Sequence, residues 1–293
     1  MSTVVLLLIT GIGLGAIYFL VASGLSLIYG LMGVLNFAHG VFLTFGAFLG
    51  WEVARVVGAA TWPAFLASLV VGALAGAVFA ALTERFLVQR LYERHIEQIL
   101  ITVGLGLAVV ALFDGIWGTD ARFITGPPWM AETTRVAGAN VPNDRFVAIG
   151  VATLVLLAIV LFLKYTRYGM IIRAGVENRS MVTALGIDVR TAFTLIFTIG
   201  GAAAGLGGVL ASHAFGYVSP MLGQTLLIFA FIVTIIGGLG SLTGAAVAAV
   251  VVALMQQFAN YYLGGTGDFA VVILLAVVLL ARPSGLMGKR VAA

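Results

Sequence analysis

Long apolar runs alternate with short polar segments along almost the whole chain. The first run, Val4 to Gly30, is ample to cross a hydrocarbon core of about 30 Å at about 1.5 Å per helical residue. Further runs reach Val57, occupy residues 64–82, 99–117, 146–163, 191–213 and 225–236, continue after a glycine-rich stretch to Leu263, and end at 269–281. This pattern predicts an all-α polytopic transmembrane bundle of about eight to nine spans, forming a single domain over residues 1–293.

Two glycine-rich breaks interrupt these runs at roughly corresponding places in the two halves of the chain. In the first, NFAHG, two polar side chains stand at membrane depth, which favours a broken or re-entrant helix over a continuous one. The second reads GGLGS, and paired breaks of this kind often mark the transport site of a membrane transporter. The candidates for the translocation path, or for holding the broken helices, are Asn36, His39, Gly40, Gly237, Gly238, Gly240 and Ser241.

Basic residues gather in three of the polar segments. Segments 83–98, 164–190 and 282–290 hold eleven of the fifteen Lys and Arg residues, and cytoplasmic segments of membrane proteins carry such an excess. The pattern therefore predicts that these segments and the carboxyl terminus are cytoplasmic and that the amino terminus is outside. The proline-containing segment 118–145, whose charges balance, is predicted to be an exposed loop on the outer side.

Segment 164–190 combines its five basic residues with interleaved apolar ones. A helix of about three turns would place Met181, Ala184 and Leu185 on one apolar face beside Arg173. Two interpretations explain this surface equally well. The segment docks a soluble partner, or it lies passively on anionic lipid headgroups.

Composition excludes several classes of protein. With 62% hydrophobic and 9% charged residues, the chain belongs in a lipid bilayer, and topology accounts for its net charge of +4 without a nucleic-acid partner. The absence of cysteine excludes thiolate chemistry, and three scattered histidines do not predict a metal site. Gly288-Lys289 lacks the surrounding residues of a P-loop. We therefore expect no catalytic residue, no metal and no cofactor, and an energy source on another protein.

Three stretches resemble one transporter family. They are NFAHG at residues 36–40, RYGMIIRAGVENRSMVTALGID at 167–188, and GGLGSLTGA at 237–245. In this order they resemble the LivH and LivM group of permease subunits of bacterial branched-chain amino acid ABC importers. The chain is nearer to the LivH type, because it lacks a long amino-terminal extension.

The resemblance implies a multi-pass protein of the bacterial inner membrane that forms the translocation path for branched-chain or similar apolar amino acids. It also implies a second, LivM-like permease, two cytoplasmic ABC ATPases and a periplasmic or extracellular solute-binding protein. Segment 164–190 then corresponds to the coupling segment that contacts the ATPases, although Asn stands where Ala is usual. The implied coupling residues are Arg173, Glu177, Asn178, Ala184, Leu185 and Gly186.

The zwitterionic solute implied by the resemblance needs a site for its carboxylate. A half-helix starting at Gly240 and Ser241 would offer backbone N–H groups and the positive end of a helix dipole. Asn36 and His39 either line the path or satisfy backbone groups that the break leaves free, and for His39 the structural role is favoured. The alternatives are a self-sufficient channel or facilitator for small solutes, and an importer of urea, short amides or aromatic acids.

Overall fold

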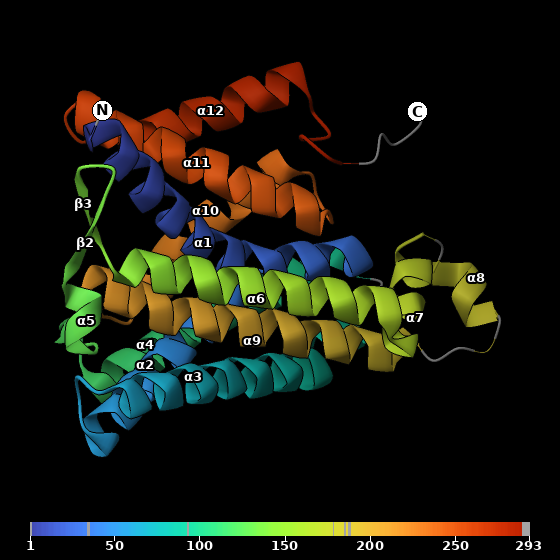
Figure 1. The fold of residues 1–293 in the computed structure, drawn as a ribbon. Helices are drawn as coiled ribbons and strands as arrows, with labels where there is room; N and C mark the ends of the chain where they lie inside the picture. The colour runs from blue at the N-terminus through green and yellow to red at the C-terminus, as the bar shows by residue number, and fades with distance from the viewer. Residues whose placement is uncertain are drawn as a thin grey trace.

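The chain was analysed as a computed structural model, which describes residues 2–33, 36–92, 94–177, 179–184, 186 and 189–288. It is built almost wholly of helices (Figure 1). The α-helices are α1 Ser2–Met32, α2 His39–Val57, α3 Trp62–Thr83, α4 His95–Trp117, α5 Pro128–Ala131, α6 Asp144–Tyr165, α7 Arg167–Glu177, α8 Arg179–Ala184, α9 Val189–Phe215, α10 Leu222–Gly237, α11 Leu242–Tyr262 and α12 Gly267–Ala281. The shorter elements are the π-helix η1 Glu84–Val88, the 3-10 helix η2 Gln89–Leu91, and the strands β1 Arg122–Phe123, β2 Thr133–Val136, β3 Ala139–Pro142 and β4 Tyr217–Val218.

Seven helices of the described chain are long and apolar enough to cross a bilayer. They are α1, α2, α3 with its short continuation, α4, α6, α9 and α11. Two shorter apolar helices, α10 and α12, complete the bundle. The fold is therefore an all-α polytopic membrane bundle, as the hydropathy pattern predicts.

Helix α9 is central to the bundle, because it packs against α1, α2 and α3 (Figure 1). Glycines on α9 make these contacts possible. A Cβ on Gly205 would collide with the carbonyl of Gly72, and one on Gly201 with the carbonyl of Gly76. Gly72 and Gly76, spaced by four residues, therefore form a small-residue pair at which two helix backbones approach each other directly.

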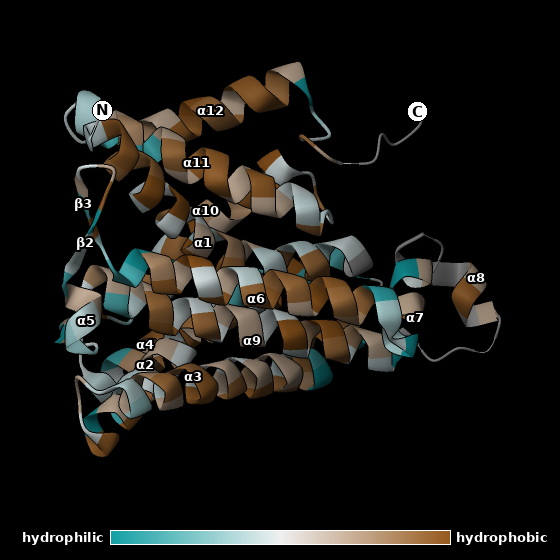
Figure 2. Cartoon of the chain, in the orientation of Figure 1, coloured by the Kyte–Doolittle hydropathy of each residue, from teal (hydrophilic) through white to brown (hydrophobic). Residues whose placement is uncertain are grey.

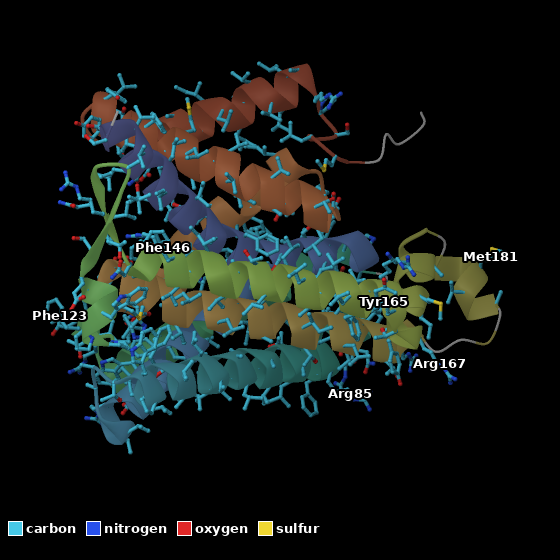
Figure 3. All side chains as sticks on the ribbon, in the orientation of Figure 1. Arg85, Phe123, Phe146, Tyr165, Arg167 and Met181 are labelled. Carbon is cyan, nitrogen blue, oxygen red and sulfur yellow. The ribbon has the colours of Figure 1, made fainter. Side chains whose placement is uncertain are left out.

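The two ends of the bundle differ in character. Hydrophilic residues gather at the ends and apolar residues cover the helices between them (Figure 2). Arg85 and Arg167 lie at one end, and Phe123 lies at the other (Figure 3). We call the first the basic end and the second the loop end. Arg85 and Arg167, from two of the segments that the charge pattern places together, 83–98 and 164–190, thus lie at the same end of the molecule.

The loop end is more ordered than a simple exposed connection. Strands β2 and β3 form an antiparallel hairpin, and β1 pairs with β4 from the α9–α10 connection. The predicted loop 118–145 ends two residues earlier than expected, because Asp144 and Arg145 already belong to α6. Val141 is fully buried, so the hairpin packs onto the bundle near the start of α1.

Candidate functional site

The first predicted break separates α1 from α2. Helix α1 ends at Met32 and α2 begins at His39, whose ring is fully buried. The His39 Nε2 lies 2.9 Å from the carbonyl oxygen of Val21, in the interior of α1. Met32 lies about 16 Å beyond Val21 at a rise of about 1.5 Å per residue. The chain therefore turns back into the bundle before α2 starts, as a re-entrant segment does.

A second helix begins beside this point. Gly40, in the first turn of α2, touches Gly223, in the first turn of α10, and a Cβ on Gly40 would lie 2.6 Å from the Gly223 carbonyl oxygen. The Gly223 N–H donates to the Thr44 Oγ1 at 2.9 Å. The amino-terminal ends of α2 and α10 thus meet inside the bundle. We call this place the helix-start junction.

The GGLGS break does not lie at the junction. Ser241 caps α11, because its Oγ accepts a hydrogen bond from the Gly244 N–H at 3.0 Å. However, α11 is a 21-residue span and not a half-helix. Gly240 packs on Gly30, at the end of the α1 span. The helix start expected at Gly240 and Ser241 is therefore confirmed and the half-helix is wrong, and the helix start inside the bundle is that of α10 at Leu222.

The glycines before Ser241 have another partner that the sequence did not indicate. Gly238 has a φ of +100°, a conformation that glycine adopts without strain. The segment after α12 packs on it, and the N–H groups of Leu286 and Met287 donate to the carbonyls of Ile236 and Gly237 at 2.8 and 3.0 Å. These bonds satisfy carbonyl groups at the end of α10. Gly237 and Gly238 therefore provide the surface on which the segment after α12 packs, at the basic end of α10.

Polar side chains from the first break and from α4 surround the junction. The Phe37 N–H lies 3.4 Å from the Thr102 Oγ1, and the Gln224 Nε2 lies against Gly106, near the middle of α4. Asn36 is 97% buried, and its Oδ1 accepts from the Ala38 N–H at 3.0 Å. In the described part of the chain, its Nδ2 has no hydrogen-bond partner.

This arrangement combines two helix amino-termini with amide groups that can donate. Asn36 Nδ2 is a buried donor without a partner among the described residues, and Gln98 Nε2, one turn before Thr102 on α4, is another. Buried donors normally find an acceptor, and helix amino-termini favour anions. The junction is therefore suited to an uncharged or anionic acceptor such as a carboxylate.

Some residues of this junction were predicted from the sequence and others were not. Asn36, His39 and Gly40 were predicted, and the structure brings them to one place. Sequence reasoning missed Gln98, Thr102 and Gln224, which are isolated polar residues within or beside apolar runs. Such residues are a signal in themselves, because a polar side chain at membrane depth is costly. Only the packing of α4 and α10 shows that Thr102 bonds Phe37, next to Asn36, and that Gln224 lies against Gly106 on the same helix as Thr102.

The predicted coupling segment forms two helices in place of one. Helix α7 has about three turns and ends at Glu177, and α8 carries Met181 and Ala184, both exposed. Arg173 on α7 is exposed as well. The described residues of the expected apolar face, Met181 and Ala184, thus lie on α8, whereas Arg173 lies on α7. Asn178 and Leu185 lie outside the described residues, and Gly186 is an exposed residue with a φ of +76°.

The model of one transporter family, described as branched-chain amino acid transport system, permease component, matches residues 7–282. The chain belongs to this family. It is 27% identical over 290 residues to the high-affinity branched-chain amino acid transport system permease protein LivH of Salmonella typhimurium, covering 95% of this chain and 94% of that one. It is 29% identical over 293 residues to the permease protein BraD of Pseudomonas aeruginosa, covering 96% and 95%.

One further relative has a different named cargo, and one solved structure is similar. The fructose import permease protein FruF of Bifidobacterium longum is 26% identical over 286 residues, covering 94% of this chain and 77% of its own. Among solved structures, PsaBC from Streptococcus pneumoniae in complex with Fab is similar with a TM-score of 0.46 and 15% identity, covering 92% of this chain and 88% of that one. Family membership therefore establishes a membrane permease subunit.

Proposed function

We propose that this chain is one permease subunit of an ABC importer for branched-chain amino acids, and that the helix-start junction contacts the solute during its passage. One observation carries the proposal. The starts of α2 and α10 meet inside the bundle beside the buried Nδ2 of Asn36, for which the described residues supply no hydrogen-bond partner. The relatives LivH and BraD, whose names specify branched-chain amino acids, support the choice of solute.

The chemistry of the junction fits a zwitterion with an apolar side chain. The positive dipole ends of two helix starts and the amides of Asn36 and Gln224 favour the carboxylate without a fixed cation. Aromatic rings lie nearby, since Phe37 packs on Phe231 with ring centroids 4.9 Å apart. Such rings offer apolar surface to an aliphatic side chain. A site without a fixed cation binds weakly, and weak binding allows release.

The energy source and the selectivity reside on partners in this proposal. Two cytoplasmic ABC ATPases dock on α7 and α8, a second permease of the same family completes the path, and an external solute-binding protein delivers the amino acid. The basic end faces the cytoplasm of the inner membrane and the loop end faces outside, because the basic segments are retained on the cytoplasmic side. The whole chain forms one permease domain.

Transport by the complex that copurifies with the tagged chain tests the solute and the junction together. In proteoliposomes, we expect ATP-dependent uptake of leucine, isoleucine and valine, and none of fructose. Gln224→Glu places a carboxylate beside the solute carboxylate and is expected to lower leucine uptake about tenfold or more, since a hydrogen bond to a charged group contributes about 1.5–3 kcal/mol. Gln257→Glu is the matched control, because this half-buried glutamine bonds Thr10 Oγ1 on α1 instead.

The outcomes separate the parts of the proposal. Uptake of fructose without leucine would make this chain a sugar permease and reject the amino acid. Leucine uptake that Gln224→Glu leaves unchanged would remove the junction from the path. Equal losses in Gln224→Glu and Gln257→Glu would show a general effect of added charge, and the junction would again be rejected.

Docking of the ATPases has its own test. The tagged chain is purified in mild detergent, and bound proteins are identified by mass. We expect the native chain to retain ATPase subunits, and the double variant Arg173→Ala with Glu177→Ala to lose them. Arg135→Ala, an exposed arginine at the loop end, is the control that leaves the complex intact. A native chain that purifies alone and still conducts solute in liposomes would be a channel.

A further inference from the structure

A carboxylate is buried where three segments meet at the basic end. Glu84, the first residue of η1, is fully buried. Its Oε1 accepts a hydrogen bond from the Tyr92 hydroxyl, and its Oε2 accepts from the Thr194 Oγ1 at 2.6 Å. Among the described residues, the recorded ion pairs involve other carboxylates. Two hydroxyl groups therefore hold this carboxylate.

The two hydroxyl donors come from different elements. Tyr92 follows η2 on the way to α4, and Thr194 lies in the first turns of α9. The Tyr92 ring also meets the Phe193 ring edge-on, with centroids 4.8 Å apart. Helix α9 begins at Val189, directly after the basic segment that contains α7 and α8. Glu84 thus joins the end of α3 and the approach to α4 to the start of α9.

Beyond Thr194, the backbone of α9 directly contacts the backbones of α3 and α2. Toward the loop end from Thr194, Gly201 lies against the carbonyl of Gly76 and Gly205 against that of Gly72 on α3. On the α2 side, a Cβ on Gly208 would collide with the carbonyl of Leu43, in the first turns of α2. Because no flexible side chain lies between the backbones at these contacts, α9 has little room to move without its neighbours. A shift at the start of α9 therefore reaches α3 and the first turns of α2.

A carboxylate held by two neutral hydroxyls is suited to a joint that changes its arrangement. A carboxylate offers about four acceptor sites, so two donors leave part of its capacity unused. Burial of an incompletely satisfied charge is costly, so a movement that brought further donors to Glu84 would be favoured. A π-helical turn, such as η1, is also frequent at functional sites.

We propose that Glu84, Tyr92 and Thr194 form a coupling joint that transmits movement of the ATPase-docking helices α7 and α8, through the start of α9, to α3 and the helix-start junction. They act as positioning residues and do not touch the solute. The inference rests on the proposed function as an ABC permease, because the movement originates in ATPase subunits. It predicts a defect in the ratio of transport to ATP hydrolysis, which a merely structural role would not change.

The test measures solute uptake and ATP hydrolysis on the same proteoliposomes of the complete transporter. Thr194→Val and Tyr92→Phe each remove one hydroxyl with little change in shape. We expect the complex to assemble and to hydrolyse ATP, while the solute moved per ATP falls at least about fivefold. Thr198→Val is the matched control, because Thr198 lies one turn along α9, is equally half-buried, and among the described residues its hydroxyl bonds only the carbonyl of Thr194. Combining Thr194→Val with Tyr92→Phe is expected to lower the solute moved per ATP no further than Glu84→Gln does. The reason is that each of these changes breaks the same joint, so their effects do not add.

Each result has one meaning. An unchanged ratio in Thr194→Val and Tyr92→Phe overturns the joint. A parallel loss of uptake and hydrolysis, with less complex recovered, also overturns it, because the residues then only support folding. A similar fall in the ratio for Thr198→Val rejects the specific role of Glu84. Absence of ATPases from the native preparation rejects the ABC permease itself, and this outcome is visible before any variant is assayed.

Discussion

At the scale of single residues, His39 shows how a polar side chain at membrane depth can be structural. Its Nε2 lies 2.9 Å from the Val21 carbonyl oxygen, and a carbonyl can only accept, so the ring carries its proton on Nε2. His39→Gln can retain a donor at this place, whereas His39→Leu, of similar volume, cannot. We expect His39→Gln to keep nearly native thermal stability and uptake, and His39→Leu to lose about 1 kcal/mol of folding free energy.

Thermal unfolding in detergent and leucine uptake check this expectation. A glutamine does not relay protons as an imidazole does. A His39→Gln variant that folds as well as the native protein and yet fails to transport would therefore show that His39 titrates during transport, and the structural role would be rejected.

At the scale of elements, the contact between the starts of α2 and α10 depends on two glycines. A Cβ at Gly40 would lie 2.6 Å from the carbonyl oxygen of Gly223, and backbone atoms cannot move aside as a side chain does. We expect Gly40→Ala to destabilise the protein by about 1–3 kcal/mol, the usual cost of overpacking, and to abolish uptake. Gly150→Ala on α6 is the control, because nothing lies within 4 Å of its added Cβ.

The melting temperature in detergent, read by size-exclusion chromatography after heating, distinguishes the two variants. We expect Gly150→Ala to be neutral or slightly stabilising, since alanine favours helix over glycine. A Gly40→Ala variant with native melting temperature and native uptake would contradict the close approach of α2 and α10.

At the scale of the whole molecule, the proposed orientation in the membrane is directly testable because the chain has no cysteine. Asp120→Cys introduces an exposed thiol at the loop end, and Ala184→Cys introduces one at the basic end on α8. We expect a membrane-impermeant maleimide to label Asp120→Cys in spheroplasts and Ala184→Cys only in inverted membrane vesicles. The reverse pattern would invert the topology and exclude α7 and α8 as the ATPase-docking surface.

The sequence by itself determined the class of the protein and much of its layout. Long apolar runs specify helices in a bilayer, because a backbone in lipid must satisfy its own hydrogen bonds. The polar residues Asn36 and His39 among glycines predicted a broken or re-entrant helix. These features are local, so a single sequence contains them.

Only the tertiary structure decided which breaks form the candidate site. GGLGS looks like a transport break by composition, yet its glycines pack against the segment at Leu286 and Met287 at the basic end. The start of α10 takes the place expected for Gly240, and Gln224 arrives there from a stretch with no glycine-rich break. Contacts between segments almost two hundred residues apart, such as Thr44 with Gly223, depend on how helices pack. Periodicity and composition describe what each segment needs to bury, whereas the packing of the whole bundle determines which partner buries it.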